Sequence, residues 1–117
     1  MLAITANTKA YLYLNRVDFR NGIDGLQAIC RNLIDQDPFS GTIFIFKNQK
    51  GTTIRALAYD GQGFWMCSKR LSKGKFLWWP NHTDSKGITL RACDLQALLW
   101  NGNPQKATFS KDWKKIG

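Results

Sequence analysis

The sequence predicts an α+β fold, in which an antiparallel β-meander is packed by one main helix and a second, shorter helix lies near the C-terminus. Apolar residues recur at helical spacing between residues 23 and 34, and short extended segments separated by glycine-containing turns follow between residues 42 and 79. The chain has 117 residues, enough to bury an apolar core, so we expect residues 1–117 to form a single domain.

The N-terminal part is expected to form a strand followed by the main helix. Residues 9–15 (KAYLYLN) alternate weakly and are rich in tyrosine, which is typical of a strand. A turn follows, with Asp18 or Asn21 available as the helix cap. One helical face then carries the apolar residues Ile23, Leu26, Ile29, Cys30, Leu33 and Ile34. Pro38 and Gly41 end this helix.

The meander is expected to contain four consecutive extended segments, at residues 42–46, 52–60, 64–71 and 75–79. The turns between them are NQKG at 48–51, DGQG at 60–63 and SKG at 72–74. Residues 88–90 (ITL) can add a last short strand. A second helix over residues 92–100 then places Leu95, Leu98 and Leu99 on one face, and Gly102 and Pro104 close it.

The alternation of the strands assigns side chains to the two sheet faces. Ile54, Ala56 and Ala58 share one face, and Arg55, Leu57 and Tyr59 share the other. In the next segment Phe64, Met66, Ser68 and Arg70 alternate with Trp65, Cys67, Lys69 and Leu71. We expect the rings near Gly63 to be core and the basic tip of this hairpin to be solvated. Phe76, Trp78 and Trp79 belong either to the core or, as one exposed ring, to a platform on which bases stack.

The positive charge is concentrated in the second part of the chain. The formal net charge is +9, and the cations and aspartates of residues 1–40 cancel, so the excess lies in residues 41–117. This asymmetry favours a nucleic acid as partner, although a solvated basic surface explains it too. The residues expected to contact nucleic acid are Lys69, Arg70, Lys73, Lys75, Arg55 and Trp78.

The composition argues against an enzyme. The chain has one histidine, His82, and no glutamate, and most of its aspartates occur at turns and caps. We find no pattern for a metal site or a bound cofactor, and we assign no catalytic residue. An aspartate-based nuclease remains an alternative if Asp18, Asp24 and Asp60 converge on one point.

The chain is expected to be a soluble, cytoplasmic protein with no membrane partner. Its N-terminus lacks the pattern of a signal peptide, and no apolar run approaches the roughly 18 residues of a membrane helix. Cys30, Cys67 and Cys93 are widely spaced among apolar residues, which favours reduced core cysteines over disulfides or a metal site.

Several motifs in the same order resemble TnpB, the accessory protein encoded by the second reading frame of insertion sequences of the sixty-six family. They are DFRNGIDGL, DPFSGTIFIF, YDGQGFW, KRLSKGKF and WWP before DLQALLWNG, and the resemblance spans residues 8–102. The basic, aromatic tail at residues 105–117 lies outside it. The matching positions of unknown role include Asp18, Arg20, Asp37, Asp60, Gly61 and Gly63. This sequence departs from the pattern at LWWP and at Arg91, where the second helix usually has a serine or threonine cap.

The resemblance implies a protein that assists a separate, larger transposase and has no agreed catalytic residues. Our leading hypothesis is a non-catalytic factor that binds transposon-end DNA, or supports the transposase on it, through backbone contacts. The alternative is a protein–protein adaptor whose aromatic surface docks on the transposase. Arg20 has a second interpretation as a structural salt bridge to Asp18 or Asp24.

Overall fold

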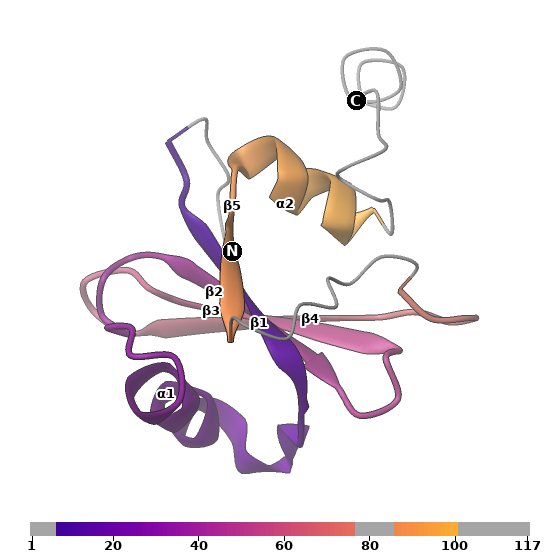
Figure 1. Ribbon diagram of the computed structural model, residues 1–117, viewed down its shortest axis with the longest axis horizontal. Coiled ribbons are helices and arrows are strands. Elements are labelled where there is room, and N and C mark those ends of the chain that lie inside the picture. Colours follow the sequence, from indigo (N-terminus) through magenta and orange to yellow (C-terminus); the bar gives the residue numbers. More distant parts are fainter. Residues whose placement is uncertain (1–6, 77–85, 101–117) are drawn as a thin grey trace.

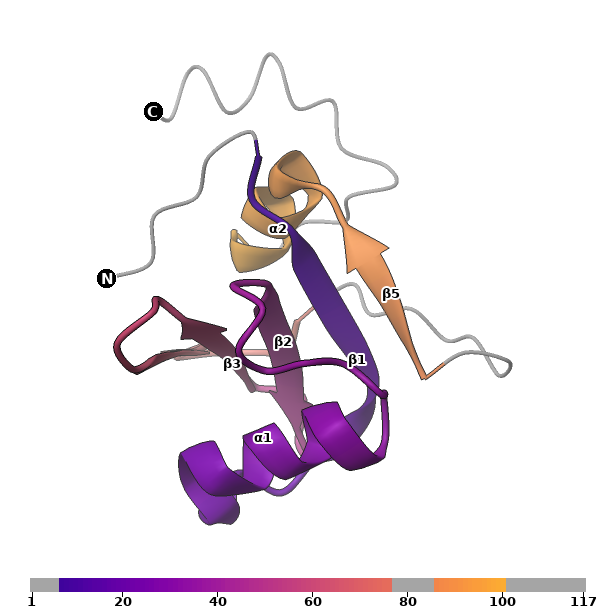
Figure 2. The ribbon, with the colours of Figure 1, turned by 90° about the vertical axis from the view of Figure 1, so that its left-hand side faces the viewer.

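The chain folds as a five-stranded mixed sheet with one helix on each face (Figures 1 and 2). The structure is a computed structural model that describes residues 7–76 and 86–100. Its elements are β1 (Ala10–Val17), the 3₁₀ helix η1 (Phe19–Asn21), α1 (Gly22–Asn32), β2 (Ile43–Asn48), β3 (Thr53–Tyr59), β4 (Phe64–Arg70), β5 (Gly87–Leu90) and α2 (Ala92–Leu99).

The sheet has the strand order β4-β3-β2-β1-β5. β2, β3 and β4 form two consecutive antiparallel hairpins, whereas β1 pairs with β2 in parallel and β5 joins the free edge of β1 antiparallel. Parallel neighbours need a crossover connection, and η1 with α1 provides it. The C-terminal ends of β1 and β2 therefore lie at the same end of the sheet.

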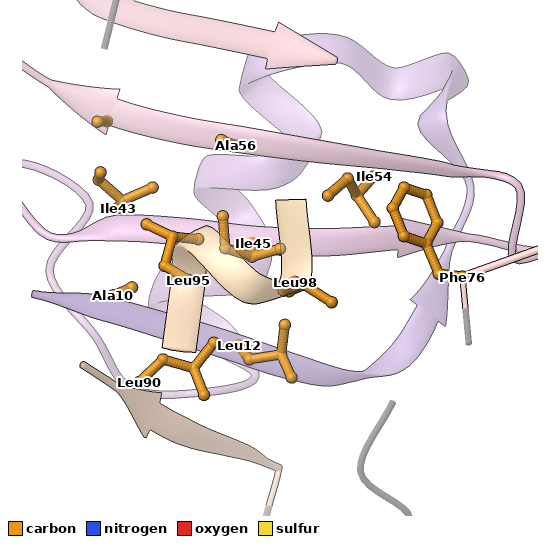
Figure 3. Close-up of a cluster of buried hydrophobic side chains, with 11 residues drawn as sticks. Ala10, Leu12, Ile43, Ile45, Ile54, Ala56, Phe76, Leu90, Leu95 and Leu98 are labelled. Atoms are coloured by element: carbon orange, nitrogen blue, oxygen red, sulfur yellow. The ribbon is translucent and has the colours of Figure 1, made fainter. Parts of the chain in front are cut away.

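The face under α2 holds one apolar core, shown in Figure 3. Leu12 of β1 and Ile45 of β2 are fully buried there against Leu95 and Leu98 of α2. Phe76 closes the side of this core and leaves 8% of its surface exposed. The two leucines lie three residues apart on α2, as the sequence predicts for one helical face.

The opposite face holds a second core under α1. Leu26 and Cys30 of α1 pack against Phe44 and Phe46 of β2 and Leu57 of β3. Because side chains alternate along a strand, residues 43 and 45 serve one core and residues 44 and 46 the other. This explains why the sequence of β2 is continuously apolar.

The α+β class, both helices, the short strand at residues 88–90 and the meander formed by β2, β3 and β4 are confirmed. Two expectations were wrong. The sheet is not purely antiparallel, because β1 pairs with β2 in parallel. Lys75 and Phe76 do not begin a fourth meander strand; the Phe76 amide donates to Gly51 O at 3.0 Å, and its ring covers the α2 core instead. Residues 77–79 of that segment lie outside the described residues.

Neither helix in the described part of the chain is long and apolar enough to cross a membrane.

Candidate nucleic-acid interface

Most of the residues expected to contact nucleic acid lie at one end of the sheet. The register pairs Arg16 of β1 with Lys47 of β2, and Thr53 of β3 with Arg70 of β4, so the turns after β2 and β4 lie at the same end (Figure 1). We call this the basic end. Its exposed cations include Arg16, Arg20, Lys50, Arg70, Lys73 and Lys75.

The segment after β4 folds back onto the β2–β3 turn. The amide of Leu71 donates to Thr52 O at 2.9 Å, and a Cβ placed on Gly51 would lie 3.9 Å from Lys75 Cδ. Arg16 Nη1 donates to Gln49 O at 2.5 Å on the other side of the same turn. The SKG turn is therefore packed against the β2–β3 turn, and cations from three chain segments lie around one surface.

The four cations expected at the hairpin tip do not act as one group. Lys69 lies on the α2 side of β4, where its Nζ donates to Leu99 O and lies 5.8 Å from the centroid of the Trp100 ring. Arg70, one residue later, faces the opposite side of the sheet. Lys69 thus holds the C-terminal end of α2, which carries the negative end of the helix dipole.

A groove of about 460 Å³ opens at the basic end, on the α1 side of the sheet. One wall is η1, the other is the β2–β3 turn, and β3 and β4 form its floor. We call it the η1 groove. Four cations and one carboxylate line it, a formal net charge of +3; they are Arg20, Lys50, Arg55, Arg70 and Asp18.

Arg55 is held rigidly in the floor of the η1 groove. Its Nη1 donates to Phe19 O at 2.8 Å, its Nε donates to Ser68 Oγ at 3.0 Å, and its guanidinium carbon lies 4.5 Å from the centroid of the Phe19 ring. Arg55 therefore ties η1 to the sheet. Its Nη2 group makes no hydrogen bond within the described residues.

Arg20 forms a salt bridge with Asp18. This was one of the two interpretations of Arg20 that the sequence allowed. Arg20 Nη2 lies 2.7 Å from Asp18 Oδ2, and the amide of Arg20 donates to Asp18 Oδ1 at 3.0 Å. The side-chain hydrogen bond from Arg20 is the main cause that holds the pKa of Asp18 below its usual value. The same bond raises the pKa of Arg20.

Asp60 and Asp37 are turn residues. Asp60 Oδ1 accepts from the amides of Gln62 and Gly63 at 2.9 Å, and its Oδ2 accepts from Trp65 Nε1 at 2.7 Å. These bonds, the backbone donors first, lower the pKa of Asp60. Asp37 Oδ1 accepts from the amide of Phe39 at 2.9 Å in the turn before β2. Gly61, directly after Asp60, has φ +98°, a conformation that favours glycine.

The aspartates of the nuclease alternative do not converge. Asp18 follows β1 at the basic end, whereas Asp60 lies beyond the last residue of β3, at the opposite end of the sheet. A seven-residue strand separates the two ends by roughly 20 Å. Among the described residues, no group of three or more His, Cys, Asp or Glu side chains could hold a metal ion.

The sequence interpretation missed Lys47. This side chain is only 8% exposed, and burial followed by the charge of Arg16 lowers its pKa to about 8. Strand alternation places it on the same face as Ile43 and Ile45, so its position could have been inferred from the sequence.

The aromatic residues divide between core and surface. Phe64 packs against the α1 core, as expected, but Trp65 on the other face of β4 is 43% exposed, so its assignment to the core was wrong. Trp100 is 58% exposed. Trp78, the expected stacking platform, and His82 lie outside the described residues.

Comparisons with known proteins give one family and two relatives. The family model described as "IS66 Orf2 like protein" matches residues 8–108. Uncharacterized protein y4hO of Sinorhizobium fredii (strain NBRC 101917 / NGR234) is 28% identical over 99 residues, which cover 85% of this chain and 84% of that protein. Uncharacterized protein y4jC of the same strain is 38% identical over 64 residues, which are 55% of each chain. No solved structure matches.

Proposed function

Because the chain belongs to the IS66 Orf2-like family of transposition accessory proteins, we propose that it assists transposition by holding transposon DNA through the phosphates of its backbone. The observation that carries this proposal is the basic end. Three segments distant in sequence, the end of β1 with η1, the β2–β3 turn and the turn after β4, bring exposed cations to one surface. A surface of this kind suits a polyanion with regularly spaced charges.

The contacts at this surface favour backbone binding over base reading. Lys50, Lys73 and Lys75 are exposed side chains on turns, and lysine binds phosphate as a mobile point charge. Such contacts position a protein on DNA and carry little sequence information. We therefore expect similar affinity for transposon-end DNA and for scrambled DNA.

A second candidate function is a protein–protein adaptor for the transposase. It is favoured by large exposed rings: Phe39 is 47% exposed, and Trp65 and Trp100 are also partly uncovered. Aromatic side chains are enriched at protein interfaces. In this alternative the positive charge serves solubility, and the chain reaches DNA only through the transposase.

The experiment that separates the two measures the anisotropy of fluorescent transposon-end and scrambled duplexes across a salt series, with and without the transposase. Our proposal requires binding by the chain alone, with log K falling linearly with log salt. DNA binding that requires the transposase, with an affinity that does not change with salt concentration, would favour the adaptor.

We propose a non-catalytic role. It is supported by the use of Asp18, Asp37 and Asp60 as acceptors for backbone amides in turns. The chain alone should not nick DNA in Mg²⁺ or Mn²⁺. Metal-dependent nicking that the Asp60→Asn substitution abolishes would overturn this part of the proposal.

A further inference from the structure

We infer that the η1 groove binds a phosphate group at the end of a DNA strand. This inference rests on the proposed function, because it identifies which part of a DNA molecule enters the groove while the exposed lysines hold the neighbouring backbone. It assigns Arg55 and Arg70 as the residues that contact the terminal phosphate.

The first reason is the fixed position of Arg55. Two of its donors and one face of its guanidinium are held by Ser68, Phe19 O and the Phe19 ring, so the side chain has little freedom left to lose on binding. Its Nη2 lacks a hydrogen-bond partner within the described residues, and the side chain lines the groove. A guanidinium held in this way is a preorganised donor for a phosphate oxygen.

The second reason is the charge around Arg55. Arg70 and Lys50 line the same groove and are exposed, and neither has a described ion pair. The carboxylate of Asp18 also lines it, but Arg20 Nε and Nη2 already donate to Asp18 at 2.9 and 2.7 Å. The groove therefore keeps a positive potential, and a terminal phosphate, which carries more charge than an internal phosphodiester, gains most from it.

The third reason is shape. The groove holds about 460 Å³, within the usual range of small-ligand sites, and it is walled by η1 and the β2–β3 turn. A phosphate in the duplex interior is linked to a sugar on both sides, so it can enter a groove only together with the backbone on either side of it. A strand end projects and can enter a walled groove together with its sugar.

The alternative is that Arg55 only joins η1 to the sheet. This explains its contacts to Phe19 and Ser68 but not the concentration of Arg70 and Lys50 around the same groove. Arg70 separates the two interpretations, because it is exposed and its side chain makes no hydrogen bond or ion pair within the described residues that a substitution would remove.

The test compares the affinity of the full chain for hexathymidylate carrying a 5′-phosphate, a 3′-phosphate or only hydroxyl ends, by titration calorimetry at low salt. The wild-type chain should prefer at least one phosphorylated form by on the order of tenfold, the effect of one charge-assisted hydrogen bond. Arg55→Gln and Arg70→Gln should each remove most of this preference. Lys9→Gln is the matched control, because it removes the same charge from an exposed residue at the opposite end of β1.

The inference is overturned by equal affinity for all three oligonucleotides. It is also overturned if Arg70→Gln retains the preference, or if Lys9→Gln loses it equally. Thymidine 5′-monophosphate competing as well as the phosphorylated oligonucleotide would assign the groove to free nucleotides and reject the strand end. If Arg55→Gln unfolds, Arg70→Gln alone decides. Failure here leaves the salt-dependent binding of duplex DNA intact, so it is distinguishable from failure of the proposed function.

Discussion

Replacing three cations of the basic end should remove a defined part of the DNA affinity. The variant combines Arg70→Ala, Lys73→Ala and Lys75→Ala and leaves Lys69 in place. The structure dictates this choice, because Lys69 Nζ donates to Leu99 O on the α2 side of the sheet, whereas the other three side chains are exposed and make no hydrogen bond or ion pair within the described residues. Exposed charges contribute little to folding, so the free energy of unfolding should change by less than about 1 kcal/mol.

The magnitude follows from counterion release. Each phosphate contact contributes about 0.9 to the slope of log K against log salt, so three contacts give about 2.7. A fourfold increase in salt, from about 50 to about 200 mM, then weakens the contribution of these contacts by about 40-fold. The variant should lose this part of the slope, and it should lose it equally for transposon-end and scrambled duplexes.

The assay is fluorescence anisotropy of both duplexes over a salt series. The control removes three cations from the other end of the sheet, through Lys9→Ala, Arg31→Ala and Arg91→Ala, and should keep most of the slope. Because Arg91 pairs with Asp94 and Arg31 hydrogen-bonds to Gln27, urea unfolding is used to verify that this variant is folded. Lys69→Ala should also keep the slope while lowering the stability of α2. A slope that is unchanged in the basic-end variant, or reduced equally in the control, would refute the reasoning.

Three further results are expected from the fold. Gly87→Ala should destabilise the protein by about 2 kcal/mol in urea unfolding, because its Cβ would lie 2.2 Å from a ring carbon of Tyr11; Gly63→Ala, with nothing within 4 Å, should cost less than about 1 kcal/mol. Cys30 should resist iodoacetamide at about pH 8 until the protein unfolds, since burial raises the pKa of its thiol to about 12, and mass spectrometry should show the half-buried cysteines reacting first. The free energy of unfolding should rise between about pH 8 and pH 10, because Lys47 is then neutral in the folded state and still protonated in the unfolded state. Lys47→Met should abolish this rise. If the rise persists in that variant, Lys47 is not its cause.

Local patterns in the sequence are sufficient to predict most elements of this fold. The apolar face of α1 and the alternation along β3 follow from the spacing of their apolar residues, and the structure places Ile54 and Leu57 on opposite faces as that spacing requires. The parallel pairing of β1 was missed. A strand followed by a helix and a second strand is compatible with it, but the choice of neighbour depends on packing distant in sequence, such as Tyr13 against Phe46 at 6.0 Å.

The candidate site is predictable only in part, for a similar reason. Composition and turn chemistry correctly indicate that the four cations of residues 69–75 are exposed. They do not indicate that Lys69 is held by the end of α2, a contact across 30 residues of sequence. Nor do they indicate that Arg55 and Arg70 share a groove with η1, since that groove exists only because β1 pairs with β2 in parallel.

The acidic positions that match the family motifs have a structural role in turns. Asp18, Asp37 and Asp60 each accept, through Oδ1, the amide of the residue two positions later, at 2.9 or 3.0 Å. Aspartate is favoured in such turns because its carboxylate replaces a backbone acceptor. The same geometry at three turns explains why aspartate suits these positions. Substitutions that test DNA binding are therefore better directed at exposed cations such as Arg70, because Arg55 also hydrogen-bonds to the backbone of η1 directly after Asp18.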